Sequence, residues 1–312
     1  MNSKTGKPLK NDPADRPETG KTLLLAAGLA IAAALLTILF VRFFNLRKTG
    51  STASVPEIPF HSETAMDIWF LDAGSGDSTL IRTPGEEWIL IDCGDQSCSD
   101  SLPRFLGDKG IRTISKLILT YDDPHRTGGL RAILSRFDVD TICFGSDLSR
   151  TTEDLIAEYR FDREIGIMKL SASIKPMISM EPGIDIFVLS PLDAAYPEPG
   201  EASTVLRIRY GSNAVLFNSE ADPLSEKLIV KAFPNRLLRA DVIKLGLNLS
   251  GEQITDKYLN AVKPSLAIVP FHSPDNIDLK KLEKRGVQIQ PIIEKGTVHI
   301  QLDGNSFRVV EY

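Results

Sequence analysis

The chain has 312 residues and a formal net charge of −5, and 42% of its residues are hydrophobic and 25% charged. These values are ordinary for a globular protein and exclude the collagen-like, fibrous and intrinsically disordered classes. The length allows one large domain or two small ones, with room for a membrane anchor.

An uncharged apolar run extends from Thr22 to Val41. A helix of that length spans about 30 Å, the thickness of the hydrocarbon core of a bilayer. The alternative is the core of a cleaved signal peptide, but the run is longer than such cores, and Arg42 follows it where small residues are expected. We therefore predict a transmembrane helix over 22–44, preceded by a polar cytoplasmic tail over 1–21 and followed by a linker over 45–65.

The distribution of charge predicts the membrane topology and bears on which partners the domain can bind. Five Lys and Arg residues precede the apolar run and three follow it closely, which favours a plasma-membrane protein with its N-terminus in the cytoplasm and its C-terminal domain outside. The first 48 residues carry a net charge of +5, so residues 49–312 carry −10. This argues against nucleic acid as a partner of the domain, because phosphate binding depends on Lys and Arg.

From Met66 to the C-terminus, short β-prone runs alternate with amphipathic segments. In chain order we predict strands over 66–71, 78–83, 88–92, 116–120, 139–145, 185–191, 203–211, 213–218, 240–245, 265–271, 287–293, 297–302 and 306–312, and helices over 101–110, 127–137, 152–159, 222–231, 252–262 and 279–285. Strands dominate and helices are inserted between them. The pattern predicts an α/β sandwich with sheets inside and helices outside.

The turn motifs carry a family resemblance. FLDAGSGDSTLI, WILIDCGD, GIRTISKLILT and TGGLRAIL, in this order and spacing, resemble the metallo-β-lactamase-like domain of the ComEC type, which belongs to DNA-uptake (competence) proteins. STVLRIRYGSNAVLFNSEA and ADVIKLGLNLS continue the likeness, which covers about residues 66–312. The resemblance implies a four-layer αββα sandwich with a two-metal hydrolase site at the sheet edges.

The same resemblance assigns the metal-ligand positions, and most of them hold other residues here. The family takes ligands from a His-x-His-x-Asp-His run after a strand, from a bridging Asp and from a His-His pair. The corresponding residues of this chain are Tyr121, Asp123, His125 and Arg126 for the run, Glu220 near the bridging Asp, and Leu247 and Asn248 for the pair. A closing His has no counterpart, because His272 lies several residues too early. We therefore expect a degenerate site without catalytic residues and predict no cofactor.

Arg126 is the most damaging of these changes, because a guanidinium has no lone pair to donate to a metal. We expect it to neutralise Asp123 or Glu220. Two acids that match family positions, Asp77 and Asp92, are expected to have structural roles.

One alternative site stays open. Asp122, Asp123 and His125, together with Glu220, could bind a metal through oxygen and nitrogen atoms. With a single imidazole, such a site would suit manganese or magnesium better than zinc. Cys93 and Cys98 could form a disulfide outside the cell or remain unpaired.

The leading functional interpretation is a membrane-anchored, catalytically inactive domain that binds an unknown protein or small molecule through the former active-site cleft. The first alternative is a divergent metal-dependent phosphoester hydrolase or nuclease that uses Asp123, His125 and Glu220. The second alternative is an accessory role in DNA uptake, which rests on family analogy alone.

Overall fold

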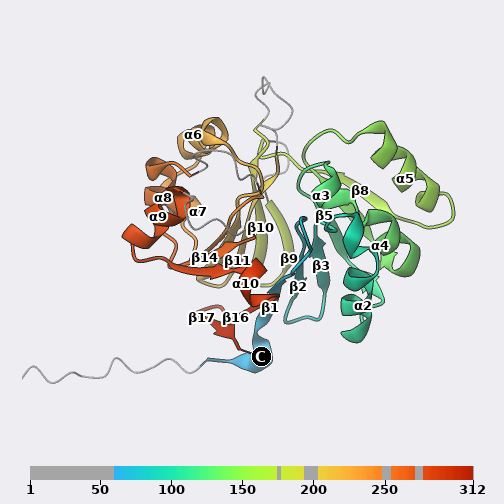
Figure 1. Ribbon diagram of the computed structural model, residues 1–312, viewed down its shortest axis with the longest axis horizontal. Coiled ribbons are helices and arrows are strands. Elements are labelled where there is room, and N and C mark those ends of the chain that lie inside the picture. Colours follow the sequence, from blue (N-terminus) through green and yellow to red (C-terminus); the bar gives the residue numbers. More distant parts are fainter. Residues whose placement is uncertain (1–59, 174–176, 193–202, 248–253, 271–276, 312) are drawn as a thin grey trace, which may run out of the picture. The chain divides into compact units, whose positions relative to one another are not determined.

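Figure 1 shows the computed structural model of the chain. The structure describes residues 60–173, 177–192, 203–247, 254–270 and 277–311. They belong to one compact unit, Phe60–Tyr312. The predicted tail over 1–21 and the predicted transmembrane helix over 22–44 lie outside the described residues, as does most of the predicted linker. Within the described ranges, no helix is both long enough and apolar enough to cross a bilayer.

The first sheet has eight strands in the order β17-β16-β1-β2-β3-β5-β7-β8. Their bounds are β1 Met66–Phe70, β2 Thr79–Arg82, β3 Trp88–Ile91, β5 Lys116–Leu119, β7 Thr141–Phe144, β8 Gly166–Lys169, β16 Val298–Leu302 and β17 Phe307–Val310. Neighbouring strands from β17 to β3 are antiparallel, and those from β3 to β8 are parallel. The parallel strands therefore bring their carboxyl ends to one edge of the sheet.

The second sheet has seven strands in the order β15-β14-β13-β12-β11-β10-β9. Their bounds are β9 Met177–Glu181, β10 Ile184–Ser190, β11 Val205–Tyr210, β12 Asn213–Phe217, β13 Val242–Lys244, β14 Leu266–Val269 and β15 Gln288–Pro291. The predicted hairpin is confirmed, since β11 pairs antiparallel with β12 and Tyr210 lies opposite Asn213. From β12 to β15 the strands are parallel.

The remaining elements are helices, 3-10 turns and a small two-stranded sheet. Their bounds are η1 Ser62–Thr64, η2 Gln96–Ser99, α2 Ser101–Asp108, β4 Thr113–Ile114, α3 Pro124–Thr127, α4 Leu130–Arg136, β6 Asp138–Val139, α5 Arg150–Arg160, α6 Pro223–Ala232, α7 Asn235–Leu238, α8 Asp256–Val262, α9 Ile277–Lys284 and α10 Ile292–Lys295. The predicted helices all occur, with small shifts at their ends. The predicted start of one, residue 252, lies outside the described residues.

Three hydrophobic layers give the αββα arrangement that the sequence predicts (Figure 1). The inner faces of the two sheets pack against each other, and the rings of Phe70 and Phe217 meet there with their centroids 6.1 Å apart. Helices α2, α4 and α5 cover the outer face of the first sheet, and α6, α8 and α9 cover the outer face of the second. Each fully buried Leu or Phe in these layers contributes about 1.5–3 kcal/mol.

For Cys93 and Cys98, the structure favours unpaired side chains over a disulfide. Cys93, Cys98 and Cys143 are all buried, and none of them forms a disulfide. Cys93 and Cys98 therefore behave as small core side chains of the layer beneath α2 and α4 rather than as a disulfide.

Candidate functional site

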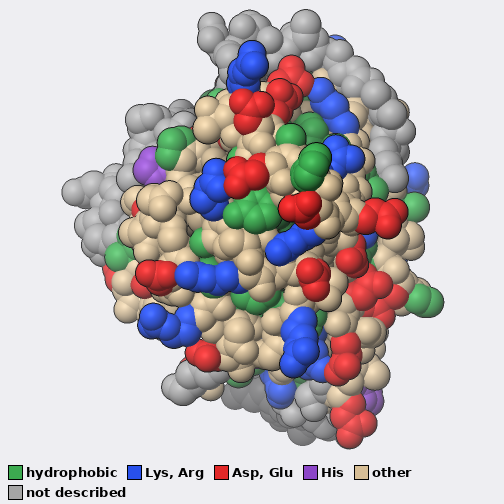
Figure 2. All heavy atoms as spheres, turned by 90° about the vertical axis from the view of Figure 1, so that its right-hand side faces the viewer, with side chains coloured by type: hydrophobic (Ala, Val, Ile, Leu, Met, Phe, Trp, Pro, Cys, Tyr) green, Lys and Arg blue, Asp and Glu red, His purple; other side chains and the backbone are tan. Residues whose placement is uncertain are grey.

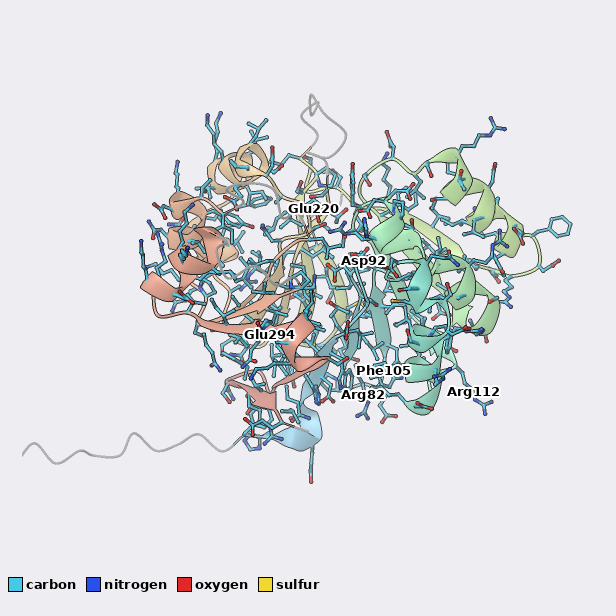
Figure 3. The ribbon with its side chains drawn as sticks, in the orientation of Figure 1. Arg82, Asp92, Phe105, Arg112, Glu220 and Glu294 are labelled. Atoms are coloured by element: carbon cyan, nitrogen blue, oxygen red, sulfur yellow. The ribbon has the colours of Figure 1, made fainter. Side chains whose placement is uncertain are left out.

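The candidate site lies where the parallel strands of both sheets end. Asp92 follows β3 and Thr120 follows β5 in the first sheet, whereas Glu220 follows β12 and Lys244 ends β13 in the second. In Figure 3, Asp92 and Glu220 lie near each other, between the two halves of the sandwich. Carboxyl ends of parallel strands are the usual place for binding sites in such sheets, because loops of both halves meet there.

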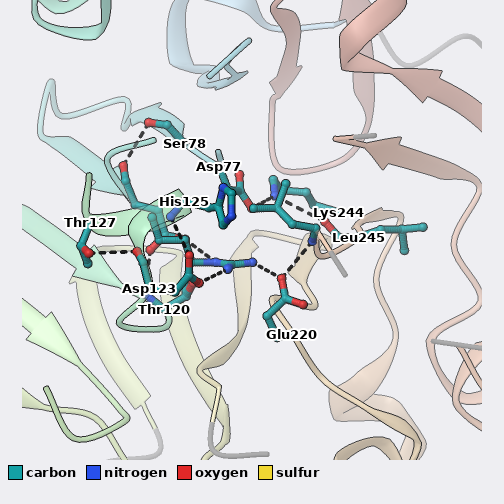
Figure 4. Close-up of polar contacts among 12 residues, drawn as sticks. Asp77, Ser78, Thr120, Asp123, His125, Thr127, Glu220, Lys244 and Leu245 are labelled. Carbon is teal, nitrogen blue, oxygen red and sulfur yellow. Dashed lines mark hydrogen bonds and ion pairs between the residues drawn. The ribbon is translucent and has the colours of Figure 1, made fainter. Parts of the chain in front are cut away.

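Arg126 is the centre of this site. Its side chain is only 2% exposed, and it forms ion pairs with Asp123 through Nη1 and with Glu220 through Nη2 (Figure 4). The Nε atom lies 3.6 Å from Oδ2 of Asp92. The predicted neutralisation of Asp123 or Glu220 is therefore confirmed for both partners. The nearby carboxylates, Glu220 first, raise the pKa of Arg126 against the opposing effect of burial, so the guanidinium stays charged.

The short helix α3 explains how Arg126 enters the site. Asp123 caps its N-terminus, where Oδ1 accepts a hydrogen bond from the backbone N–H of His125 at 2.7 Å. The backbone of α3 is tied to two neighbouring loops, because His125 O accepts from Asp77 N at 2.9 Å and Arg126 O accepts from Cys93 N at 2.7 Å. These bonds fix the direction in which the Arg126 side chain leaves the helix.

Asp92 links the ends of two neighbouring strands of the first sheet. It has a left-handed backbone with φ of 59°, which Asp tolerates better than most residues. Its carboxylate accepts hydrogen bonds from the N–H of Thr120 at 2.8 Å and from its hydroxyl at 2.6 Å, which joins β3 to the end of β5. Burial raises the pKa of Asp92 to about 7, against the opposing charge of Arg126 and with a smaller contribution from Asp77.

The raised pKa of Asp92 predicts a pH-dependent stability. The folded protein holds this proton more tightly than the unfolded chain, so the contribution of Asp92 to stability falls as pH rises from about 4 to about 7. We expect the free energy of unfolding of the wild type, measured relative to Asp92→Asn, to decline over this range. A difference that is flat with pH would contradict the raised pKa.

Asp95 provides a control of opposite sign for this experiment. Burial is the largest single effect and opposes the shift, but the hydrogen bonds from Ser75 and Ser97 together outweigh it and lower the pKa of Asp95 to about 2. The contribution of Asp95 is therefore present above about pH 4 and is lost on acidification. The same urea titrations, carried out on Asp95→Asn, should give the reverse trend.

A second buried ion pair joins the two halves, and sequence reasoning missed one of its members. Lys244, at the end of β13, donates to Oδ2 of Asp77, and their side chains are 5% and 7% exposed. The turn that precedes Asp77 requires glycine, since a Cβ on Gly76 would lie 2.4 Å from the carbonyl oxygen of His125. The sequence did contain a signal for Lys244, because a Lys occurs within the apolar run ADVIKL. A buried Lys normally requires a carboxylate partner.

A cavity of about 560 Å³ opens beside Arg126. Its wall is formed by Gly74, Ser75, Tyr121, Asp123, His125, Arg126, Glu220, Leu247, Pro270 and Ile293. It therefore collects most of the residues that the sequence placed at the degenerate site. Burial, followed by the charge of Asp123, raises the pKa of Tyr121. The Nδ1 atom of His125 lies 3.4 Å from the hydroxyl oxygen of Ser75.

The proposed grouping of Asp122 with the other candidates is wrong. Its carboxylate accepts hydrogen bonds from Ser149 N and, at 2.8 Å, from the hydroxyl of Thr152, so it supports the first turn of α5. Free N–H groups at the start of a helix attract carboxylates. The sequence of the loop does not reveal that the start of α5 binds the Asp122 carboxylate in place of the candidate site. Asn248 and His272 lie outside the described residues.

Comparison with known proteins identifies the family. The sequence profile of the Metallo-beta-lactamase superfamily matches residues 71–246, more than half of the chain. The chain belongs to the metallo-β-lactamase superfamily. It is 27% identical over 247 residues to "Competence protein ComA" of Neisseria gonorrhoeae, covering 77% of this chain and 32% of that protein. It is also 22% identical over 261 residues to "ComE operon protein 3" of Bacillus subtilis, covering 76% and 33%.

The chain spans about a third of the length of these curated relatives. The ComEC-type resemblance of the domain is thus confirmed. Among solved structures, a mutant of the CmlA beta-hydroxylase matches with a TM-score of 0.53 and 13% identity, over 78% of this chain and 55% of that one. This likeness supports the fold alone.

The residues at the site do not fit the two-metal centre that the metallo-β-lactamase family implies. A metal ligand must offer a lone pair, but the nearest carboxylates, Asp123 and Glu220, already bind the buried guanidinium of Arg126. Asp77 is likewise paired with Lys244. Within the described part of the chain, no group of three or more His, Cys, Asp and Glu side chains is arranged to hold a metal ion.

Proposed function

We propose that this metallo-β-lactamase domain is a non-catalytic, membrane-anchored module that binds a partner molecule through the cavity beside Arg126. The observation that carries the proposal is the pairing of Arg126 with both Asp123 and Glu220. A permanent cation stands among the carboxylates that would otherwise be available to a metal. The cavity itself remains, with space for a ligand.

A divergent phosphoester hydrolase is the weaker proposal. Its three candidate residues lie on the wall of one cavity, but two of them, Asp123 and Glu220, are neutralised by Arg126. A metal ion placed there would be repelled by the guanidinium and by the ammonium of Lys244, which reaches Asp77. The donor set therefore favours binding without metal-assisted hydrolysis.

The names of the relatives support a function associated with competence. We propose that the domain, anchored by residues 22–44 and facing outward, contributes to such a system by binding a small molecule or a protein rather than DNA. The charge of −10 on residues 49–312 disfavours phosphate backbones. On the face in Figure 2, acidic and basic side chains alternate, and the residues drawn in colour form no continuous basic stripe.

The proposal predicts that chelation has no effect on stability. EDTA should leave the melting temperature of the chain unchanged, because no metal contributes to folding. Added manganese or zinc should not produce hydrolysis of bis(p-nitrophenyl) phosphate above the rate of a blank that contains the metal without the protein. A fall of several degrees with EDTA, or metal-dependent turnover, would refute the non-catalytic assignment.

A further inference from the structure

The charge around the cavity is negative, although Arg126 is among its lining residues. Two carboxylates, Asp123 and Glu220, and one guanidinium, Arg126, line the cavity. Exposure adds to this excess of acid. The side chains of Asp123 and Glu220 are 19% and 14% exposed, whereas Arg126 is 2% exposed behind them. A molecule entering the cavity therefore meets carboxylate oxygens before it meets the guanidinium.

One carboxylate oxygen of Glu220 is available to accept a hydrogen bond from a ligand. Its Oε1 atom accepts both from Arg126 and, at 3.0 Å, from the backbone N–H of Leu247. None of the residues that the structure describes donates to its Oε2 atom, and the residue lines the cavity. A carboxylate oxygen that faces a cavity is a strong acceptor for a charged donor.

Part of the cavity wall is apolar. Leu247, Pro270 and Ile293 line it together with the ring of Tyr121. Ile293, on α10, is 52% exposed, so its side chain is accessible to a molecule in the cavity that it lines. The cavity wall thus combines carboxylates with apolar side chains, and its volume of about 560 Å³ is larger than a single ion requires.

We propose that this cavity binds a small organic monocation, a primary alkylammonium with a short apolar chain. The inference rests on the proposed binding function and names its ligand class. The ammonium group donates to Glu220, and the chain lies along Leu247 and Ile293. A carboxylate or phosphate ligand is disfavoured because it would face Asp123 and Glu220. A bare divalent ion would lack three free donors and would be repelled by Arg126.

Calorimetric titration of the 312-residue chain with three matched probes tests the inference. Pentylammonium, pentanol and pentanoate share a chain and differ only in the charge of the head group. We expect pentylammonium to bind at least about tenfold more tightly than either of the others. Equal or tighter binding of pentanoate, or no binding of pentylammonium, would overturn the inference.

Two variants and one control variant locate the binding site. Glu220→Gln should weaken pentylammonium binding by about tenfold, whereas Glu158→Gln, at an exposed residue of another groove, should leave it unchanged. Because Glu220→Gln also removes a partner of Arg126 and could impair folding, Ile293→Ser provides a second test on an exposed residue. It should reduce the affinity for pentylammonium more than the affinity for methylammonium. Equal losses of affinity for both amines would show that the alkyl chain of the ligand does not contact Ile293, which contradicts the inference.

The inference and the proposed function fail in distinguishable ways. If pentylammonium does not bind and the chain still shows no metal-dependent turnover, the ligand class is wrong and the non-catalytic assignment stands. If manganese binds tightly and supports phosphodiester hydrolysis, the proposed function itself is wrong. Competition between manganese and pentylammonium for one site would contradict the proposed loss of the metal site, but not the ligand class.

Discussion

Arg126→Ala is expected to destabilise the fold by about 3–5 kcal/mol, the usual cost of removing one partner from a buried ion-pair network. The substitution would leave Asp92, Asp123 and Glu220 facing one another without a cation. Their mutual repulsion would force protons onto them or admit water into the site. Urea unfolding followed by circular dichroism, with the linear dependence on denaturant, gives the free energy directly.

The matched control for Arg126 is Arg131→Ala on α4. Arg131 also pairs with a carboxylate, since its two terminal nitrogens lie 3.0 and 3.1 Å from the oxygens of Glu158, but both side chains are more than half exposed. Solvent screens such a pair, so its loss should change stability little. Similar effects of the two substitutions would mean that burial does not strengthen the role of Arg126.

Lys244→Met is expected to cost a comparable amount, about 3–5 kcal/mol, because it leaves the Asp77 carboxylate buried without its cation. The methionine keeps most of the volume and apolar contacts of the lysine stem, so the loss reports the charge rather than a cavity. The same urea titration measures it. Both ion pairs join the first sheet to the second, so each substitution also loosens the contact between the halves.

A double substitution separates the pair from its surroundings. Asp77→Asn combined with Lys244→Met should cost less than the sum of the single substitutions, because no unpaired charge remains buried. The control is Lys169→Met, which removes the exposed pair with Asp147 at 2.6 Å and should cost less than about 1 kcal/mol. Strict additivity of the two changes at the buried pair would show that Asp77 and Lys244 do not interact.

The turn motifs made much of this architecture predictable from the sequence. Glycine-rich turns fix the loops between strands, as Gly76 shows, and the spacing of apolar residues predicted the strands and helices around them. The pairing of Arg126 with Asp123 and Glu220 could also be predicted, because a cation and two acids occupy corresponding positions of one site. A permanent charge at a buried position needs a partner, and few acids were within reach.

Two features could not be predicted because they depend on where side chains turn. Asp122 follows the same strand as Asp123, but it reaches the first turn of α5, about 27 residues later in the chain. The pairing of Lys244 with Asp77 joins residues separated by 167 positions, and only the packing of the two sheets brings them together. Local sequence contains no information on such distances.

The metal content of the chain tests most directly whether this site has lost its two-metal centre. Elemental analysis of the 312-residue chain, purified without chelator and then dialysed against equimolar manganese, zinc and iron, measures it. We predict far less than one metal ion per chain, since Arg126 neutralises Asp123 and Glu220. One or two equivalents of a transition metal that disappear in Glu220→Gln would show that the centre persists, and that Arg126 does not replace it.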